Sequence, residues 1–267
     1  MNATVGMRWL ASHLLPSQVR RSLGERIGGR ERLADITPAD HLRESLAQPR
    51  VPRVWIDVGA YRGDMTFPWA RRCPNLTVYA FEPNLKLAAL LSGRLSNYVV
   101  IPAAVAEHDG VAPFFVTRFP ASSSLLPLNP DGARRWVGGE KLEVIEETAV
   151  ATIQLETFLN VMKIATVDFL KVDAQGADLA VIASAGSRLR DISRVVFEVG
   201  VTPDQVYVGA PSKARALEFM RRNGFELRDT RAQSSGQEEN LTFTRATPAP
   251  PRGLERAEGI SPLTAAR

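Results

Sequence analysis

The 267-residue sequence contains one cysteine, Cys73, which excludes an internal disulfide and any cysteine-rich zinc site. It has no apolar run close to the roughly 18 residues that cross a bilayer, and its N-terminus lacks the compact apolar segment of a secretion signal. These absences predict a chain without a transmembrane segment in a reducing compartment, the cytoplasm. No long basic run and no set of stacking aromatic residues indicates nucleic-acid binding.

Arginine, in contrast, is abundant and far outnumbers lysine. The formal net charge is +4 and the isoelectric point is about 9.5. A small excess of positive charge spread over the whole chain most simply favours solubility. Binding of an anionic partner, such as a nucleotide-sugar, a phospholipid surface or RNA, is the alternative. Hydrophobic residues make up 45% of the chain, which is enough for a globular protein with a full core.

Composition divides the chain into three zones. Residues 1–50 are arginine-rich with apolar positions at roughly helical spacing, which predicts a helical extension packed on the core. Peripheral membrane contact through residues 1–30 is the alternative, because arginine opposite Trp and Leu is typical of helices at membrane surfaces. Residues 51–246 form the predicted domain, and the proline-containing tail 247–267 is expected to be disordered.

Within the domain, apolar strands alternate with helices, which predicts a mostly parallel, doubly wound α/β sheet. Strands are expected at 51–59, 77–81, 98–105, 167–173 and 194–199, and helices at 64–72, 84–95, 156–163, 176–185 and 212–223. Segments 225–228 and 241–245 predict an antiparallel hairpin at one edge of the sheet. Segments 111–117 and 142–153 predict a second hairpin, or flap, joined by a loop.

The first candidate motif ends the strand at 51–59, where Asp57 precedes a turn with Gly59 and Gly63. Glycine lets the backbone turn tightly and approach a ligand. A carboxylate there would repel a pyrophosphate but attract a ligand with ammonium and sulfonium centres, and the spacing departs from the glycine pattern of dinucleotide folds. A purely structural turn is the alternative.

Two further carboxylates end neighbouring strands. Glu82 ends the second strand, where a carboxylate can accept from both ribose hydroxyls of an adenosine. Asp173 ends the strand at 167–173 and therefore lies at the crevice where open α/β sheets bind ligands. Helix capping is the alternative for both residues.

Four blocks of the sequence together resemble the FkbM-type methyltransferase family over roughly residues 51–245. They are Asp57-Val58-Gly59-Ala60, Phe81-Glu82-Pro83-Asn84, Ser122-Ser123-Ser124-Leu125 and Leu170-Lys171-Val172-Asp173-Ala174-Gln175-Gly176. The resemblance implies a Rossmann-like class I methyltransferase fold and S-adenosylmethionine as methyl donor. It also implies O-methylation of a sugar, glycolipid or polyketide-type natural product.

The resemblance also implies a set of cofactor residues. Asp57, Gly59 and Gly63 would line the methionine part, Glu82 the ribose, and Ala104 with Val105 the adenine. The neighbouring Ala60, Tyr61, Pro83 and Asn84, together with Asp173, complete the predicted cofactor site.

Transfer to an alcohol is an in-line displacement in which the alcohol loses its proton, so alignment and a positioned base both contribute. Asp173 is the first candidate base and His108 the second. Candidates for contacts with a small-molecule or glycan acceptor are Ser122, Ser123, Ser124, Glu198 and Tyr207. A polar cluster at 237–240 lies close to a sheet edge, and its orientation is left open.

The third block departs from the usual family form. Ala174-Gln175 stands where Val-Glu is common, and Asp178 where Glu is common. The change removes a carboxylate beside Asp173, so no metal ligand is predicted and a divalent cation stays open. An NAD-dependent oxidoreductase and a non-catalytic Rossmann-like interaction module are the alternative functions.

Overall fold

The computed structural model describes residues 50–203 and 205–246. The predicted disordered tail lies outside these residues, as does the predicted N-terminal helical extension apart from Arg50. Not one of the helices in the described ranges combines the length and the apolar character needed to cross a membrane.

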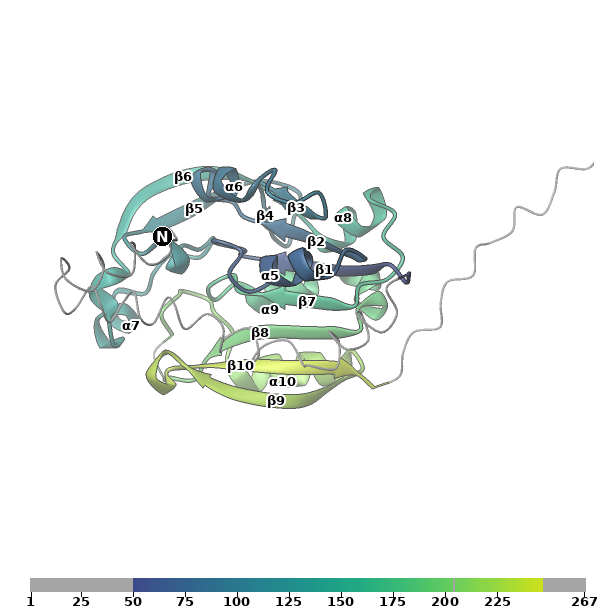
Figure 1. Cartoon of the computed structure of the whole chain (residues 1–267). Helices are drawn as coiled ribbons and strands as arrows, with labels where there is room; N and C mark the ends of the chain where they lie inside the picture. Colours follow the sequence, from purple (N-terminus) through teal and green to yellow (C-terminus); the bar gives the residue numbers. More distant parts are fainter. Residues whose placement is uncertain (1–49, 204, 247–267) are drawn as a thin grey trace, which may run out of the picture.

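The centre of the molecule is a seven-stranded sheet with the order β3-β2-β1-β7-β8-β10-β9. All neighbouring strands run parallel except β10, which is antiparallel to both β8 and β9. Figure 1 shows this sheet crossing the molecule from β2 and β3 to β9. The strands are β1 (Arg53–Val58), β2 (Leu76–Phe81), β3 (Tyr98–Ile101), β7 (Phe169–Val172), β8 (Arg194–Gly200), β9 (Phe225–Gln233) and β10 (Glu238–Arg245).

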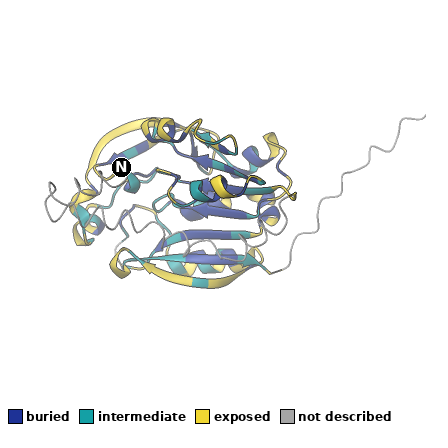
Figure 2. Ribbon diagram, viewed as in Figure 1, coloured by how far each residue is buried: buried dark blue, intermediate teal, exposed yellow. Residues whose placement is uncertain are grey.

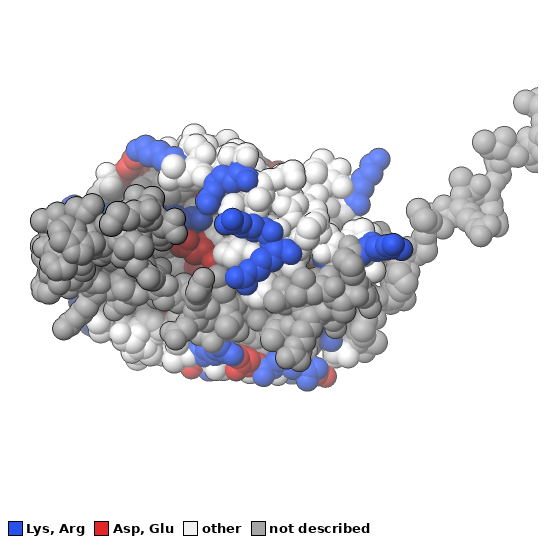
Figure 3. All heavy atoms as spheres, viewed as in Figure 1, with Lys and Arg blue, Asp and Glu red and all other residues white. Residues whose placement is uncertain are grey.

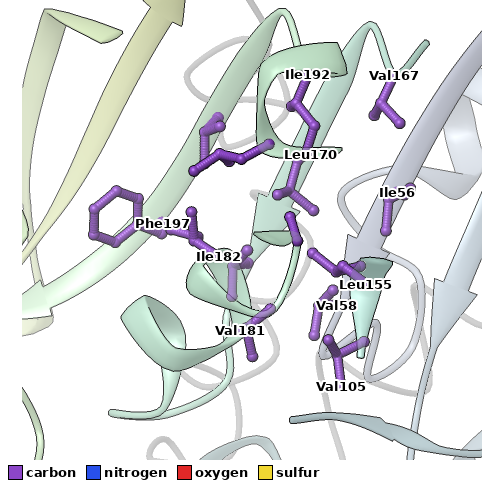
Figure 4. Packing of buried hydrophobic residues seen from close by; sticks show 14 of the residues in the cluster. Ile56, Val58, Val105, Leu155, Val167, Leu170, Val181, Ile182, Ile192 and Phe197 are labelled. Atoms are coloured by element: carbon purple, nitrogen blue, oxygen red, sulfur yellow. The ribbon is translucent and has the colours of Figure 1, made fainter. Parts of the chain in front are cut away.

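Helices pack on both faces of the sheet because its central strands carry apolar side chains on both sides. On one face Ile56 and Val58 of β1 join a large core with side chains of α8 (Leu155–Val161), α9 (Asp178–Ala183) and α10 (Lys213–Arg222). Figure 4 shows part of this packing. On the other face Trp55 packs with α5 (Phe67–Arg72) and α6 (Leu85–Leu91).

The burial pattern follows this layering. Trp55 lies against Phe169 of β7, with ring centroids 5.1 Å apart, and both side chains are buried. In Figure 2 the inner strands of the sheet are dark blue, whereas the edge hairpin and the curved second sheet are largely yellow and teal. The predicted doubly wound α/β fold and its C-terminal hairpin are both confirmed.

A second, three-stranded sheet has the order β4-β6-β5, with β4 parallel and β5 antiparallel to β6. The strands are β4 (Ala104–Val105), β5 (Gly110–Thr117) and β6 (Val144–Ile153). The prediction of one strand over 98–105 was therefore wrong. Pro102 has no N–H to donate to a ladder, and the chain passes there from the central sheet to the second one.

The segment between β5 and β6 is more structured than expected. It contains a six-residue helix, α7 (Pro130–Arg135), and two 3₁₀ turns, η1 (Pro120–Ser122) and η2 (Gly139–Lys141). The sequence did carry a signal for α7, because Asn129 caps the helix by accepting from the N–H of Asp131, and proline is favoured at the first helical position. Two further 3₁₀ turns complete the described elements, η3 (Gly186–Asp191) and η4 (Ser234–Gly236).

Candidate active site

A buried ion pair lies beneath the carboxyl ends of β1 and β7. Asp57 is completely buried, and its Oδ1 lies 3.0 Å from Nζ of Lys171, which is also buried. The hydroxyl of Thr66 donates to Oδ2 of Asp57 at 2.5 Å. Burial alone would lower the pKa of Lys171, but the carboxylates of Asp57 and Asp173 raise it above its usual value. Lys171 therefore neutralises Asp57 from within the fold.

The turn after β1 brings the backbone of β1 against that of β7. A Cβ at Gly59 would lie 2.0 Å from the carbonyl oxygen of Asp173, and φ of Gly59 is +72°. Lys171 Nζ donates to the Gly59 carbonyl at 2.7 Å. Only glycine fits this position, because the left-handed conformation and the close approach both exclude a side chain.

Glu82 follows β2 with its carboxylate held by backbone donors. Oε2 accepts from the N–H of Tyr61 at 2.7 Å, and Oε1 accepts from the N–H of Asn84 at 2.9 Å. The side chain is 5% exposed, and burial raises the pKa of Glu82 to about 7 despite these two hydrogen bonds. The carboxylate thus links the β1 turn to the start of α6 and keeps unused acceptor lone pairs.

Asp173 follows β7, and its side chain is 37% exposed. Its Oδ1 accepts from Nε2 of Gln175 at 2.7 Å, and its Oδ2 lies 3.6 Å from Nζ of Lys171. Oε1 of Gln175 and the carbonyl oxygen of Ser122 both lie 2.8 Å from the hydroxyl of the buried Tyr207. The Tyr207 hydroxyl has one proton and two acceptors within reach, and it orients the Gln175 amide toward Asp173.

A group of carboxyls with raised pKa values lies near Asp173. Burial, and then the charges of Asp173 and Glu238, raise the pKa of Glu198 well above its usual value. Glu238 forms a side-chain hydrogen bond with Glu198, and burial raises its pKa as well. Burial and the charge of Asp173 raise the pKa of Asp178 to about 7. Glu198 and Glu238 therefore favour a state in which they share a proton.

Glu82, Asp173, Glu198, Tyr207 and Glu238 line one open cavity of about 1410 Å³. Pockets for one drug-sized ligand measure about 300–1,000 Å³, so this cavity has room for two ligands together. The wall contains most of the predicted site residues, namely Gly59, Ala60, Tyr61, Gly63, Glu82, Pro83, Ala104, Val105, Ser122, Ser123, Ser124, Asp173, Glu198 and Tyr207. The ends of β1, β2 and β7 and the short β4 thus contribute to a single space.

Three predicted site residues are not in this wall. Asp57 lies beneath the cavity, paired with Lys171, and acts on a ligand only through the residues above it. Asn84 caps α6 with its side chain, which accepts from the N–H of Lys86 and Leu87. His108 is exposed in the turn between β4 and β5, where its carbonyl accepts from Thr152. The interpretation of His108 as a catalytic base is therefore withdrawn.

The serine triplet lies in the wall, but two of its hydroxyls are used within the fold. Ser123 Oγ accepts from the N–H of Thr117 at 3.1 Å, and Ser124 Oγ donates to the carbonyl of Gln175 at 2.8 Å. The first bond holds the loop to the end of β5, and the second ties the same loop to the turn after β7. Ser124 therefore positions the wall, because its proton is used within the fold, whereas Ser123 only accepts and keeps its hydroxyl proton for an acceptor.

Sequence reasoning did not place Lys171, Gln175 or Glu238 at the site, although all three line the cavity. Lys171 stands in a strand whose pattern is otherwise apolar, and such a cation requires a buried partner. Gln175 has a φ of +52°, and the sequence pattern does not predict this left-handed conformation in the turn after β7. Glu238 belongs to the polar cluster at 237–240, whose orientation only the β8–β10 pairing reveals.

The described residues contain no group of three or more His, Cys, Asp or Glu side chains that could hold a metal ion. The sheet order, the glycine turn and the acidic strand ends are those of a class I methyltransferase.

The methyltransferase FkbM domain matches residues 57–227 of the sequence, and the chain belongs to this family. The match confirms the predictions of a methyltransferase and of S-adenosylmethionine as its cofactor, and it excludes the alternative of an NAD-dependent oxidoreductase. A comparison with curated proteins found no match.

Several solved methyltransferase structures are similar to this chain. Magnesium protoporphyrin IX methyltransferase from Synechocystis PCC 6803 with bound S-adenosylmethionine is 12% identical, with a TM-score of 0.44 and coverage of 91% of this chain and 92% of that one. The 1,6-didemethyltoxoflavin-N1-methyltransferase from Burkholderia thailandensis is 14% identical, with a TM-score of 0.41 and 92% coverage of each chain. Similarity at this level gives no information on the acceptor.

Proposed function

We propose that this protein transfers the methyl group of S-adenosylmethionine to a hydroxyl of a sugar, glycolipid or polyketide-type natural product in the cytoplasm. The observation that carries the proposal is that Glu82 and Asp173, which follow β2 and β7 on either side of β1, line the same cavity. S-adenosylmethionine supplies a methyl group on a positively charged sulfur.

The residues of the cavity fit this cofactor. The backbone donors of Tyr61 and Asn84 hold the Glu82 carboxylate in place. Its remaining lone pairs are free to accept from the two ribose hydroxyls. The apolar Ala104 and Val105 offer a surface for the adenine. Gly59 and Gly63 leave the backbone of the β1 turn open to the methionine part.

Asp173 is the proposed base. Its carboxylate opens to the cavity and accepts the proton that the acceptor hydroxyl loses as the oxygen attacks the methyl carbon. Gln175 holds Oδ1 of Asp173, so Oδ2 is the oxygen that remains for the proton. Glu198 shares a proton with Glu238, and its remaining lone pairs can accept a hydrogen bond from a second acceptor hydroxyl.

The experiment supplies the protein with methyl-labelled S-adenosylmethionine and separate pools of sugars, glycolipids and polyketides, and follows label transfer. We expect transfer to one pool by the native protein, and loss of at least about 100-fold in the Asp173→Asn variant, which is the scale for a missing general base. S-adenosylhomocysteine should bind that variant within a few-fold of the native affinity.

The matched control is Asp229→Asn, on β9 but outside the cavity wall, which should transfer label at the native rate. Transfer to nitrogen or carbon acceptors alone would reject O-methylation. Undiminished transfer by Asp173→Asn would reject Asp173 as the base.

A further inference from the structure

The mouth of the cavity carries a group of arginines. Arg62 follows β1, Arg71 and Arg72 end α5, and Arg94 follows α6, and all four are exposed and line the cavity. Lys141 is exposed and lines the cavity as well, and Asp64 is the one exposed carboxylate among the lining residues. Figure 3 shows blue side chains gathered on the face that carries α5, beside a recessed group of red side chains.

These arginines differ from several other exposed arginines in how they are partnered. Arg118, Arg222 and Arg228 each form an ion pair with a glutamate. Across residues 50–203 and 205–246, no carboxylate pairs with the arginines of the mouth. Arg62 lies over the Tyr61 ring and Arg94 over the Phe67 ring, so their guanidinium groups keep free donors.

The inner end of the cavity has the opposite sign. Glu82, Asp173 and the Glu198–Glu238 pair line it, and the cation Lys171, which also lines it, is paired with Asp57. An anionic ligand is therefore repelled from the inner end and attracted to the mouth, whereas a neutral hydroxyl meets no such barrier. This separation of charge would orient an acceptor that carries an anionic group at one end and a hydroxyl at the other.

We propose, on the basis of the function above, that the acceptor carries an anionic group, a phosphate or a carboxylate, which Arg62, Arg71 and Arg72 bind at the cavity mouth. The planar guanidinium fork matches either anion with two parallel hydrogen bonds. The hydroxyl end of the same acceptor then reaches Asp173, so the arginines select the acceptor and set its direction.

The test titrates protein loaded with S-adenosylhomocysteine, using inorganic pyrophosphate in one arm and citrate in the other, followed by calorimetry. We expect binding of at least one anion, weakened about tenfold or more in Arg71→Gln/Arg72→Gln. The matched control is Arg134→Gln/Arg135→Gln, because these arginines also end a six-residue helix, α7, outside the cavity wall. The control should bind within about twofold of the native protein.

The two arms distinguish phosphate from carboxylate. The proposal is overturned if neither anion binds, or if the control variant weakens binding as much as the test variant. It is also overturned if pyrophosphate displaces S-adenosylhomocysteine, or if Arg71→Gln/Arg72→Gln weakens the binding of S-adenosylhomocysteine. Either result would mean that the arginines bind the carboxylate of the cofactor. Failure of the native protein to bind S-adenosylhomocysteine would reject the proposed function instead, and the same titrations on the unloaded protein would still decide the anion site.

Discussion

At the scale of the residue, Glu82 combines two opposing effects. Its two backbone donors favour the ionised carboxylate, whereas burial favours the neutral acid, and the result is a pKa of about 7. Only the ionised form keeps lone pairs free on both oxygens for the two ribose hydroxyls, beside the two backbone hydrogen bonds. Binding of an adenosine ligand should therefore depend on pH around neutrality.

We predict that the affinity for S-adenosylhomocysteine falls about tenfold between pH 8 and pH 6, since the ionised fraction of a group with a pKa of about 7 falls about tenfold there. Calorimetry at several pH values measures this. The Glu82→Gln variant should bind about tenfold or more weakly at pH 8 and lose the pH dependence. Glu226→Gln, on β9 but outside the cavity wall, should behave like the native protein. An equal slope in Glu82→Gln would mean that another group controls binding.

The sequence was informative at this scale where a residue type and its strand position coincide. The positions of Glu82 and Asp173 after apolar strands were enough to predict that both reach one crevice. It was less informative for Asp57, because the strand pattern does not reveal that Lys171 on the neighbouring strand turns inward to neutralise it. His108 was a candidate only for its residue type, and the fold leaves it exposed in a turn.

At the scale of the element, the site depends on how closely the β1 turn approaches β7. Gly59 and Gly93 provide a matched comparison, because φ is +72° and +73° respectively. A Cβ at Gly59 would meet the Asp173 carbonyl oxygen at 2.0 Å, whereas a Cβ at Gly93 would meet nothing within 4 Å. The two positions therefore share the cost of backbone conformation and differ only in crowding.

We predict that Gly93→Ala lowers the free energy of unfolding by about 1–2 kcal/mol, the cost of a left-handed alanine. Gly59→Ala should cost about 1–3 kcal/mol more, because the added methyl group forces β1 and β7 apart. Urea unfolding of both variants measures the difference. Equal losses would show that the two strand ends do not touch as described.

Element boundaries were less predictable than element types. Each long apolar or amphipathic segment gave a strand or helix of the expected kind, including the C-terminal hairpin. The prediction of a single strand at 98–105 was wrong because the apolar run continues through Pro102, whereas the hydrogen bonding changes there from one sheet to the other. Helix α7 was missed because it is short and its apolar content is low.

At the scale of the whole molecule, carboxyls in and behind the cavity wall have charged forms that are destabilised by burial. Glu82 lines the cavity, and Asp178 is buried behind the turn after β7. Glu82 and Asp178 each have a pKa of about 7 in the folded protein, against 4.5 and 3.8 for the free groups. The folded state therefore binds these protons more tightly than the unfolded state, so the free energy of unfolding rises as the pH falls from about 7 toward 4.5. The free energy of unfolding is therefore lower at neutral pH than at pH 5, because these buried carboxyls are partly ionised at neutral pH.

We predict that Asp178→Asn becomes more stable relative to the native protein by about 2 kcal/mol as the pH rises from 5 to 7, because a pKa difference costs about 1.4 kcal/mol per unit. Loss of a carboxylate acceptor for the N–H of Ala174 and Gly176 adds a cost that does not vary with pH. Urea unfolding at pH 5, 6 and 7 measures the trend. The half-buried control Asp229→Asn should show none of this trend, and a flat difference for Asp178→Asn would contradict the assignment.

The account as a whole depends on one cavity in which neighbouring strand ends hold one nucleoside. The most direct measurement is a crystal structure of the protein with S-adenosylhomocysteine. We predict that both ribose hydroxyls lie within hydrogen-bonding distance of the Glu82 carboxylate, that the adenine lies against Ala104 and Val105, and that the sulfur faces Asp173. A ligand bound elsewhere, or one whose ribose does not contact Glu82, would contradict the account.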